Sequence, residues 1–187
     1  MKMREWIFRM RGGLWTLIFV AILFMVRGAS WGMICASVMI VMLGQIWRCW
    51  SAGAIGLYRG ENVKALKLAV TGPYAIMRNP LYFGNFVIGL GWSVIAGGWA
   101  VVIFTVSFYI LYVIVIIPHE EEFLRHKFGS EYEEYCVKVK RFYPSHIDMN
   151  ALKAPIDFDT VKRSEIHTVI STIIGTAIII AVSLCYD

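Results

Sequence analysis

The chain has 187 residues, of which 58% are hydrophobic and 17% are charged, and its net charge at pH 7 is +5. This composition excludes an ordinary soluble domain and predicts an integral membrane protein with a single domain over residues 1–187. The cations lie mainly between apolar segments, so we expect the lipid bilayer as a partner and no nucleic acid.

Five apolar segments are candidates for membrane-spanning helices, since about 20 residues cross a bilayer core. They run from about Trp6 or Leu14 to Val26, from Ala29 to Trp47, from Leu81 to Ala96, from Trp99 to Ile117 and from Ile166 to Tyr186. Arg48 is expected to end the second segment and Pro118 the fourth. The sequence predicts an all-α polytopic membrane bundle of about five helices, two of them within residues 1–50 and an additional C-terminal one over residues 166–186.

The lysines and arginines predict the orientation of this bundle. Four precede the first segment, five lie between the second and third, eight lie between Pro118 and Ile166, and Arg27 stands apart. Cytoplasmic loops are enriched in these residues, so the rule places 17 of the 18 cations in the cytoplasm. We expect a multi-pass protein whose N-terminus is cytoplasmic.

A first polar cluster, GPYAIMRNPLYFG over residues 72–84, leads into the third segment. It has a structural explanation, because Asn79 suits a helix N-cap and Pro80 suits the first helical position. That explanation does not account for Tyr74 upstream or for Tyr82 and Gly84 downstream. Gly84, in particular, would leave room for a group to approach the backbone.

A second polar cluster begins at His119 and continues as three glutamates, Glu120 to Glu122, directly after the fourth segment. The glutamates could form a solvated helix turn. A carboxylate that instead faces the bundle needs a cationic or donor partner, for which Arg78 is the nearest candidate. The third and fourth segments form a hairpin that returns both clusters to the same face, so the clusters can meet.

Residues 119–142 are expected to form two cytoplasmic helices, broken at Gly129 and capped by Ser130. Tyr132 and Tyr135 would share one face of the second helix, which could equally be an interfacial amphipathic helix. The glycines of the third segment and of the turn after it are expected to be close helix contacts. These are Gly84, Gly89, Gly91, Gly97 and Gly98. The histidines lack the spacing of a metal site, so no metal is expected.

In their order and spacing, the two clusters resemble the superfamily of isoprenylcysteine carboxyl methyltransferases and phospholipid methyltransferases, which are integral membrane enzymes. The resemblance covers residues 72–144 and implies that they form the cofactor-binding and catalytic core, with S-adenosylmethionine as the cofactor. It implies a cytoplasmic pocket between the loop before the third span and the helices after the fourth. The cofactor-binding residues would be Tyr74, Arg78, Asn79, Pro80, Tyr82, Gly84, Glu120, Glu121 and Tyr135.

The resemblance implies transfer of a methyl group to a lipophilic acceptor, such as an isoprenylcysteine carboxylate or a phospholipid amine. Arg78 and Glu121 would be the catalytic residues, with Arg78 pairing with a carboxylate of the cofactor or substrate. Glu121 or Tyr135 could take a proton from an amine acceptor. The prenylcysteine branch usually has histidine in place of Asn79, whereas the phosphatidylethanolamine branch is similar to this chain there.

Two other functions stay open at this point. Sterol reductases show a similar arginine-asparagine turn and acidic helix, which would make the chain an NADPH-dependent membrane reductase. A non-enzymatic membrane scaffold would use every motif for capping or packing. The acceptor and the oligomeric state do not follow from the sequence.

Overall fold

The computed structural model describes residues 6, 10–56, 67–143, 149–153 and 155–186, and every regular element in these ranges is a helix. The elements are α2 (Arg11–Met25), α3 (Trp31–Gly56), α4 (Pro73–Ile76), α5 (Pro80–Ala96), α6 (Gly98–Phe108), the π-helix η1 (Tyr109–Ile116), α7 (Ile117–Phe128), α8 (Ser130–Lys138), α9 (Met149–Leu152) and α10 (Phe158–Leu184). The all-α prediction is confirmed for this part of the chain. Five of the cations counted above lie outside it, namely Lys2, Arg4, Arg9, Arg59 and Lys64, and so does Pro144, the last residue of the region that carries the resemblance.

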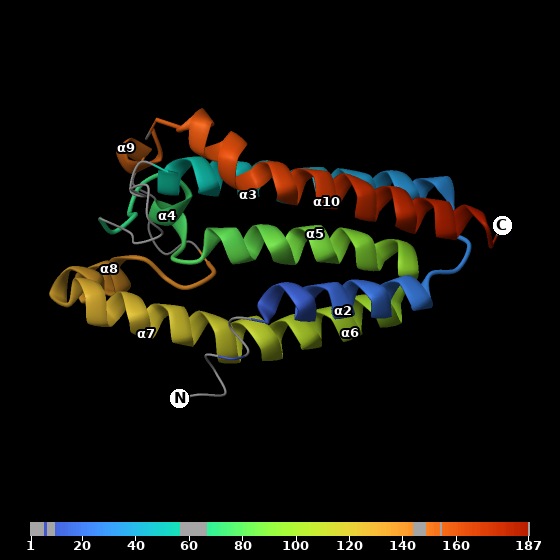
Figure 1. The fold of residues 1–187 in the computed structure, drawn as a ribbon, viewed down its shortest axis with the longest axis horizontal. Helices are drawn as coiled ribbons and strands as arrows, with labels where there is room; N and C mark the ends of the chain where they lie inside the picture. The colour runs from blue at the N-terminus through green and yellow to red at the C-terminus, as the bar shows by residue number, and fades with distance from the viewer. Residues whose placement is uncertain (1–5, 7–9, 57–66, 144–148, 154, 187) are drawn as a thin grey trace.

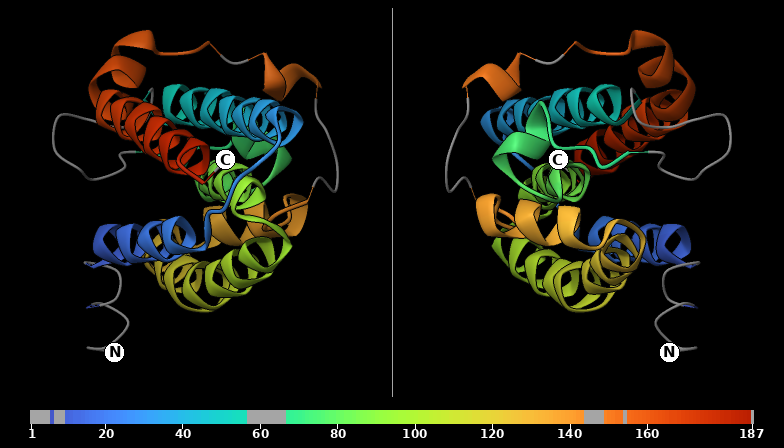
Figure 2. Two further views of the ribbon diagram at one scale, coloured as in Figure 1. Left: turned by 90° about the vertical axis from the view of Figure 1, so that its right-hand side faces the viewer. Right: turned by 90° about the vertical axis from the view of Figure 1, so that its left-hand side faces the viewer.

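The long helices lie along one common axis, and the short helices α4, α8 and α9 gather at one end of them (Figure 1). Viewed along this axis, α5 is central, with α3 and α10 on one side and α2 and α6 on the other (Figure 2). The apolar core is built from α2, α3, α5, α6, η1 and α10, and it includes the fully buried Phe104, Ile116 and Ile179.

Three helices are long and apolar enough to cross a membrane, and they cover Trp31–Ile55, Gly98–Phe128 and Phe158–Leu184. Two shorter apolar helices cover Gly12–Met25 and Pro80–Ala96. The 17 residues of α5 rise about 25 Å, against about 30 Å for a bilayer core. Crossing by α2 and α5, and with it the five-span arrangement, stays a prediction.

The prediction that the second apolar helix ends at Arg48 is wrong, because α3 continues to Gly56. The Nε atom of Arg48 lies 2.8 Å from a carboxylate oxygen of Glu165 in α10, and the guanidinium also donates to the side chain of Asn85 in α5. An arginine can stay inside an apolar bundle when its charge is paired in this way. Arg48 is therefore an internal contact between three helices and not a boundary.

The helix that contains the fourth apolar segment does not stop at Pro118 either, because α6, η1 and α7 form one continuous helix. The N–H of Ile117 donates to the carbonyl of Tyr112, five residues earlier, which is the wide π-helical pattern. A proline ring clashes with the preceding turn of a regular α-helix, and a wider turn relieves that clash. The helix therefore carries the three glutamates beyond the apolar segment without a break.

Close helix packing is confirmed for the glycines inside α5. A Cβ atom added at Gly84 would lie 2.9 Å from Cγ of Arg48 and 3.2 Å from the carbonyl oxygen of Gly44. The space beside Gly84 therefore admits α3 and not a ligand. The prediction is wrong for Gly97 and Gly98, where an added Cβ would meet nothing within 4 Å. Gly97 instead makes the turn between α5 and α6, with φ of +96°.

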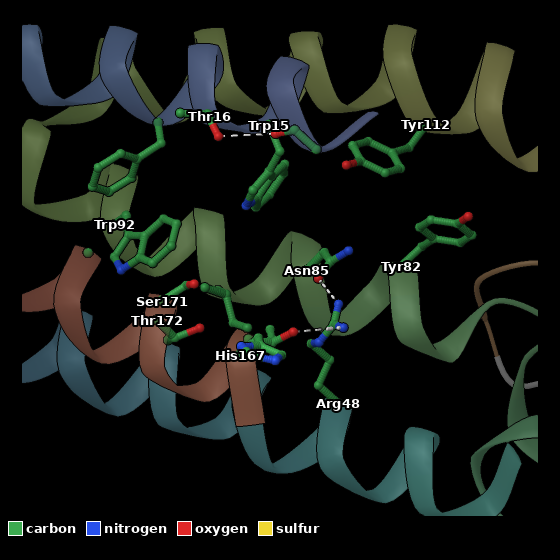
Figure 3. Close-up of a pocket in the computed structure, with 15 residues that line it drawn as sticks. Trp15, Thr16, Arg48, Tyr82, Asn85, Trp92, Tyr112, His167, Ser171 and Thr172 are labelled. Carbon is green, nitrogen blue, oxygen red and sulfur yellow. Dashed lines mark hydrogen bonds between the residues drawn. The ribbon is translucent and has the colours of Figure 1, made fainter. Parts of the chain in front are cut away.

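A cavity of about 500 Å³ lies between α2, α5 and α10 (Figure 3). Its walls combine aromatic side chains, among them Trp15 and Trp92, with polar ones, among them Arg48 and Asn85. The side chain of Tyr82 lies at the end of this cavity that is nearer the short helices.

Candidate functional site

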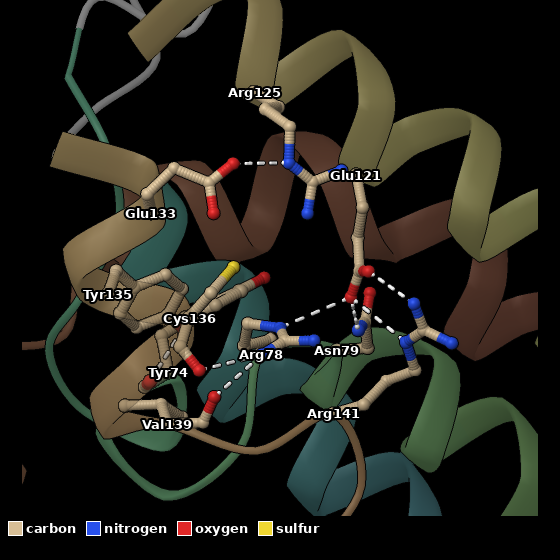
Figure 4. A network of polar contacts seen from close by, with 10 residues as sticks. All are labelled: Tyr74, Arg78, Asn79, Glu121, Arg125, Glu133, Tyr135, Cys136, Val139 and Arg141. Atoms are coloured by element: carbon tan, nitrogen blue, oxygen red, sulfur yellow. Dashed lines mark hydrogen bonds and ion pairs between the residues drawn. The ribbon is translucent and has the colours of Figure 1, made fainter. Parts of the chain in front are cut away.

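The hairpin of α5 and the continuous α6–η1–α7 helix brings the two polar clusters together at one end of the bundle. Nε of Arg78, just before α5, lies 3.2 Å from Oε1 of Glu121 in α7 (Figure 4). These residues stand 43 positions apart in the chain. The prediction that the two polar clusters meet is therefore confirmed, and Glu121 is the carboxylate on which their contacts centre.

Glu121 is 3% exposed and accepts hydrogen bonds from three side chains. Besides Arg78, these are Asn79, whose Nδ2 lies 3.0 Å away, and Arg141, whose Nη2 lies 2.5 Å away. Asn79 does precede α5, but its side chain makes no capping hydrogen bond. The expected capping role is wrong for this side chain, because the amide turns toward the buried carboxylate, whose negative charge needs a donor.

Arg78 is held by the protein through Nε, Nη1 and its backbone N–H. Its Nη1 donates to the carbonyl of Cys136 at 3.2 Å and to the carbonyl of Val139 at 2.9 Å. The last carbonyls of a helix have no partner within the helix, so Arg78 supplies donors to the C-terminal end of α8. Its backbone N–H also donates to the carbonyl of Lys140 at 2.9 Å. Arg78 thus joins the start of α5, the middle of α7 and the end of α8.

Gly129 turns the chain sharply between α7 and α8. It has φ of +54° and precedes the first residue of α8, Ser130. The predicted break at Gly129 is confirmed, whereas the predicted cap is wrong, because no side chain makes a capping hydrogen bond there. A positive φ favours glycine, so the turn depends on the backbone of Gly129 and not on the Ser130 hydroxyl.

Tyr135 lies on α8 against the loop before α5. Its buried hydroxyl donates to the carbonyl of Tyr74 at 2.7 Å. Burial raises the pKa of Tyr135 well above its usual range. At neutral pH this hydroxyl keeps its proton, so the geometry favours a packing role for Tyr135 and does not favour a general base.

Of the remaining predicted site residues, some lie beside this cluster and one lies at the interface between α3 and α5. Pro80 is the first residue of α5, in the position expected for it. The hydroxyl of Tyr82, half a turn further, lies 2.6 Å from Oε2 of Glu120. Gly84 faces α3 and takes no part in the cluster. Glu120 and Tyr82 therefore form a second pair beside the one between Arg78 and Glu121.

Two residues of the cluster were absent from the predicted site. Arg141 follows α8 in the basic segment Lys138 to Arg141, and its contact with Glu121 in the structure shows its role. Tyr132 is 1% exposed, and its hydroxyl has no hydrogen-bond partner within the described ranges. Burial and the negative charge of Glu121 raise the pKa of Tyr132. The spacing of Tyr132 and Tyr135 indicated a shared face, but not that this face is buried together with Leu68 and Val139.

A metal site receives no support from the residues that the structure describes, since they contain no group of three or more histidine, cysteine, aspartate or glutamate side chains able to hold an ion. The expectation that no metal is used stays a prediction.

Comparison of the chain with known proteins shows which family it is similar to. The family model described as phospholipid methyltransferase matches residues 31–131, from the start of α3 to the start of α8. A protein of Oryza sativa subsp. indica named probable protein-S-isoprenylcysteine O-methyltransferase is 39% identical over 79 residues, which are 42% of this chain and 41% of that protein. The corresponding protein of Oryza sativa subsp. japonica matches to the same extent.

A third relative is a Delta(14)-sterol reductase of Gallus gallus, 30% identical over 90 residues. That match covers 46% of this chain and 13% of the reductase. The matches thus span less than half the length of each of these relatives. No solved structure matches the chain. Because the family match covers more than half of the chain, including both polar clusters as far as Glu131, the chain belongs to the phospholipid methyltransferase family of membrane proteins.

Proposed function

We propose that the protein transfers a methyl group from S-adenosylmethionine to a lipophilic acceptor, such as an isoprenylcysteine carboxylate or a phospholipid amine. The observation that carries the proposal is the convergence of Arg78, Asn79 and Arg141 on the buried carboxylate of Glu121. The family match supports methyl transfer, and residues 72–144 would form the cofactor-binding and catalytic core.

The charges of the cluster suit this cofactor. Two guanidinium groups, of Arg78 and Arg141, face the single carboxylate of Glu121, so one positive charge is left over. S-adenosylmethionine carries a carboxylate that can offset it, together with hydroxyl and amino groups. The buried hydroxyl of Tyr132, without a partner in the described ranges, is a further position where a bound polar group would be stabilised.

Each side chain would have a distinct part in binding. Arg141 uses Nε and Nη2 for Glu121 and is 37% exposed, so its Nη1 is placed to pair with the cofactor carboxylate. Glu120, held by Tyr82, would bind the cofactor amino group. Arg78 and Asn79 would mainly position Glu121, to which both donate. This modifies the expectation that Arg78 itself pairs with the carboxylate.

When bound, S-adenosylmethionine supplies a methyl group that its sulfonium already makes electrophilic. The protein then needs to align the acceptor and exclude water. A carboxylate acceptor needs no base, whereas an amine acceptor must lose a proton. Glu121 is poorly suited to receive that proton, because it already accepts from Arg78, Asn79 and Arg141. The cation distribution supports a site that faces the cytoplasm.

Titration calorimetry with S-adenosylmethionine tests the proposal on the full chain in detergent micelles. Arg141→Ala is expected to weaken binding at least tenfold, because it removes the charge that faces the cofactor carboxylate. Lys140→Ala removes an exposed neighbouring cation and is expected to leave binding within twofold. Radiolabelled S-adenosylmethionine, incubated with the protein and native membrane extract, would identify the acceptor. A wild-type protein without affinity for S-adenosylmethionine would rule the proposal out.

The similarity to the Delta(14)-sterol reductase favours a second candidate, an NADPH-dependent membrane reductase. The same calorimetry separates the two, because a reductase binds NADPH in preference to S-adenosylmethionine. Binding of neither compound would favour a membrane scaffold.

A further inference from the structure

The helices α9 and α10 follow the region matched by the family model, which ends at residue 131, and the proposed site gives them no role. The short helix α9 packs against α4, and the start of α10 lies at the same end of the bundle (Figure 1). Arg78, Asn79 and Glu121 meet at this end as well. The C-terminal part of the chain therefore lies beside the loop that carries the site.

The first contact of this part of the chain is with the residue that precedes α4. The backbone N–H of Gly72 donates to the carbonyl of Ala151 in α9 at 2.8 Å. Gly72 has φ of +61°, a conformation that favours glycine, and the chain turns there into α4. The helix α8 holds α4 as well, through the hydrogen bond from Tyr135 to the carbonyl of Tyr74. Contacts with α8 and α9 thus fix α4, which ends two positions before Arg78.

The second contact joins the start of α10 to the last turn of α3. The N–H of Asp157, the N-cap of α10, donates to the carbonyl of Gly53 at 3.3 Å. A Cβ atom added at Gly53 would lie 2.5 Å from Cγ2 of Ile156 and 2.9 Å from Cγ2 of Val161. The two segments can approach this closely because position 53 has no side chain.

The third contact reaches α5 through an ion pair. Glu165 of α10 accepts hydrogen bonds from Nε and Nη2 of Arg48, at 2.8 Å and 3.0 Å, and the same guanidinium donates to the side chain of Asn85 in α5. An unpaired charge inside an apolar bundle is costly, so Glu165 keeps Arg48 in its place beside α5. Asn85 lies about one turn after Tyr82, whose hydroxyl donates to Glu120.

Further along, α10 is attached to the bundle by two more hydrogen bonds between side chains. Thr172 donates to Oε1 of Gln45 in α3 at 2.9 Å, and Nε1 of Trp92 in α5 donates to the hydroxyl of Thr176 at 2.9 Å. Polar contacts of this kind hold apolar helices together in a membrane. The start of α10 is therefore the end of a firmly attached helix.

We propose that α9 and α10, with the capping residue Asp157, form a clamp that keeps α4 and the start of α5 in the arrangement that binds the cofactor. The inference rests on the proposed methyl transfer. Gly53 and Glu165 are positioning residues of this clamp, because they act on the cluster around Glu121 through other segments. Gly53 admits the start of α10, and Glu165 holds Arg48 against α5. Release of the clamp should weaken cofactor binding while the apolar core stays folded.

Hydrogen–deuterium exchange tests the clamp without the cofactor. In the full chain, in dodecyl maltoside micelles, Gly53→Ala places a methyl group where Ile156 and Val161 lie, and so should displace α9 and the start of α10. We expect deuterium uptake at the start of α4 to rise about threefold, because Gly72 loses its partner, while uptake in α6 is unchanged. Gly98→Ala is the matched control, since an added Cβ there meets nothing within 4 Å.

Calorimetry on the same variants connects the clamp to the site. The Kd of S-adenosylmethionine should rise about fivefold in Gly53→Ala and stay within about twofold in Gly98→Ala. Adding Ile156→Ala and Val161→Ala to Gly53→Ala removes the two methyl groups that overlap the added one. This triple variant should return both the uptake at the start of α4 and the Kd to near the wild-type values. A general loss of stability at position 53 would not be reversed in this way.

A second variant tests the contact with α5 and decides the question if Gly53→Ala does not fold. Arg48→Met combined with Glu165→Met removes the ion pair without leaving a charge unpaired, so the melting temperature should stay within about 5 °C of the wild type. Deuterium uptake around Asn85 should rise, and the Kd of S-adenosylmethionine should rise about fivefold.

The outcomes separate the clamp from the proposed function. Unchanged uptake at Gly72 in Gly53→Ala, or an unchanged Kd in either the Gly53→Ala or the paired variant, overturns this inference alone when the wild type binds S-adenosylmethionine. A wild-type protein without affinity for S-adenosylmethionine overturns the proposed function and the role of the clamp in cofactor binding together.

Discussion

The guanidinium of Arg78 and the carboxylate of Glu121 lie 3.2 Å apart at the open end of a helical hairpin, with the carboxylate almost fully buried. Arg141 approaches the same carboxylate from the chain beyond α8. Three segments that are remote in the sequence are thus joined through one acidic side chain. Removing that side chain affects both the packing of these segments and the proposed cofactor site.

Glu121→Gln is expected to lower the free energy of unfolding by about 3 kcal/mol, because it leaves two arginines facing one another without a buried counter-charge. Binding of S-adenosylmethionine should be lost in the same variant. Glu122→Gln is the control, since Glu122 is exposed on the same turn. Thermal melts in micelles, followed by circular dichroism, would compare the two. Equal melting temperatures would show that Glu121 does not hold the cluster together.

Tyr82→Phe removes the hydroxyl that donates to Glu120 and keeps the ring. A hydrogen bond to a charged group contributes about 1.5 kcal/mol, so we expect the Kd of S-adenosylmethionine to rise about tenfold. Tyr109→Phe, on the lipid-exposed side of η1, should leave the Kd unchanged. Calorimetry on both variants checks this prediction, which fails if the two Kd values agree.

Gly84→Ala should lower the free energy of unfolding by about 2 kcal/mol, because the added methyl group overlaps Arg48 and the backbone of α3. Gly98 is the first residue of α6, and an added Cβ there meets nothing within 4 Å, so Gly98→Ala should be neutral or stabilising by about 0.5 kcal/mol. Denaturant titration in micelles measures both changes. If Gly84→Ala unfolds like the wild type, the close approach of α3 and α5 at this point is not rigid.

Asp157 caps α10, and its side chain accepts hydrogen bonds from the backbone N–H groups of Asp159 and Thr160. The Thr160 hydroxyl and the two backbone N–H groups, which all donate to this carboxylate, lower the pKa of Asp157 below its ordinary value of 3.8. The cap therefore stabilises the helix above that value, and the stabilisation is lost as the pH falls through the lowered pKa. At neutral pH, Asp157→Ala should speed trypsin cleavage after Lys162 and Arg163. Asp159→Ala, which removes no cap, should not.

Much of the site could be predicted because its signals are local. Pro80 after Asn79 marks the beginning of α5, the glycine at position 129 marks the end of α7, and the glutamates after Pro118 mark the end of the apolar stretch. The hairpin between the two clusters returns them to the same end of the bundle. These features predicted that the two clusters meet. The partner of Glu121 at position 141 could not be predicted, because an arginine in a basic tail carries no local sign of where its side chain points.

The polar interior of the bundle was missed for a related reason. Arg48 near the end of an apolar segment reads as a boundary, and Glu165, just before the last apolar segment, carries no local sign of its partner. Only their contact in space shows that each makes the burial of the other possible. Gly84 likewise read as room for a ligand, because the sequence does not tell which neighbour fills the space beside a glycine.

The π-helix from Tyr109 to Ile116 fixes how the glutamates of α7 are turned about the helix axis. Each residue of an α-helix rotates the chain by about 100°. Loss of one residue within this stretch, which would restore the regular α-helical pattern, would therefore swing Glu121 away from Arg78 by roughly that angle, while the apolar segment itself stayed intact. The length of this apolar stretch thus determines the direction in which Glu121 points, so a deletion there should be as damaging as a change to the charged residues.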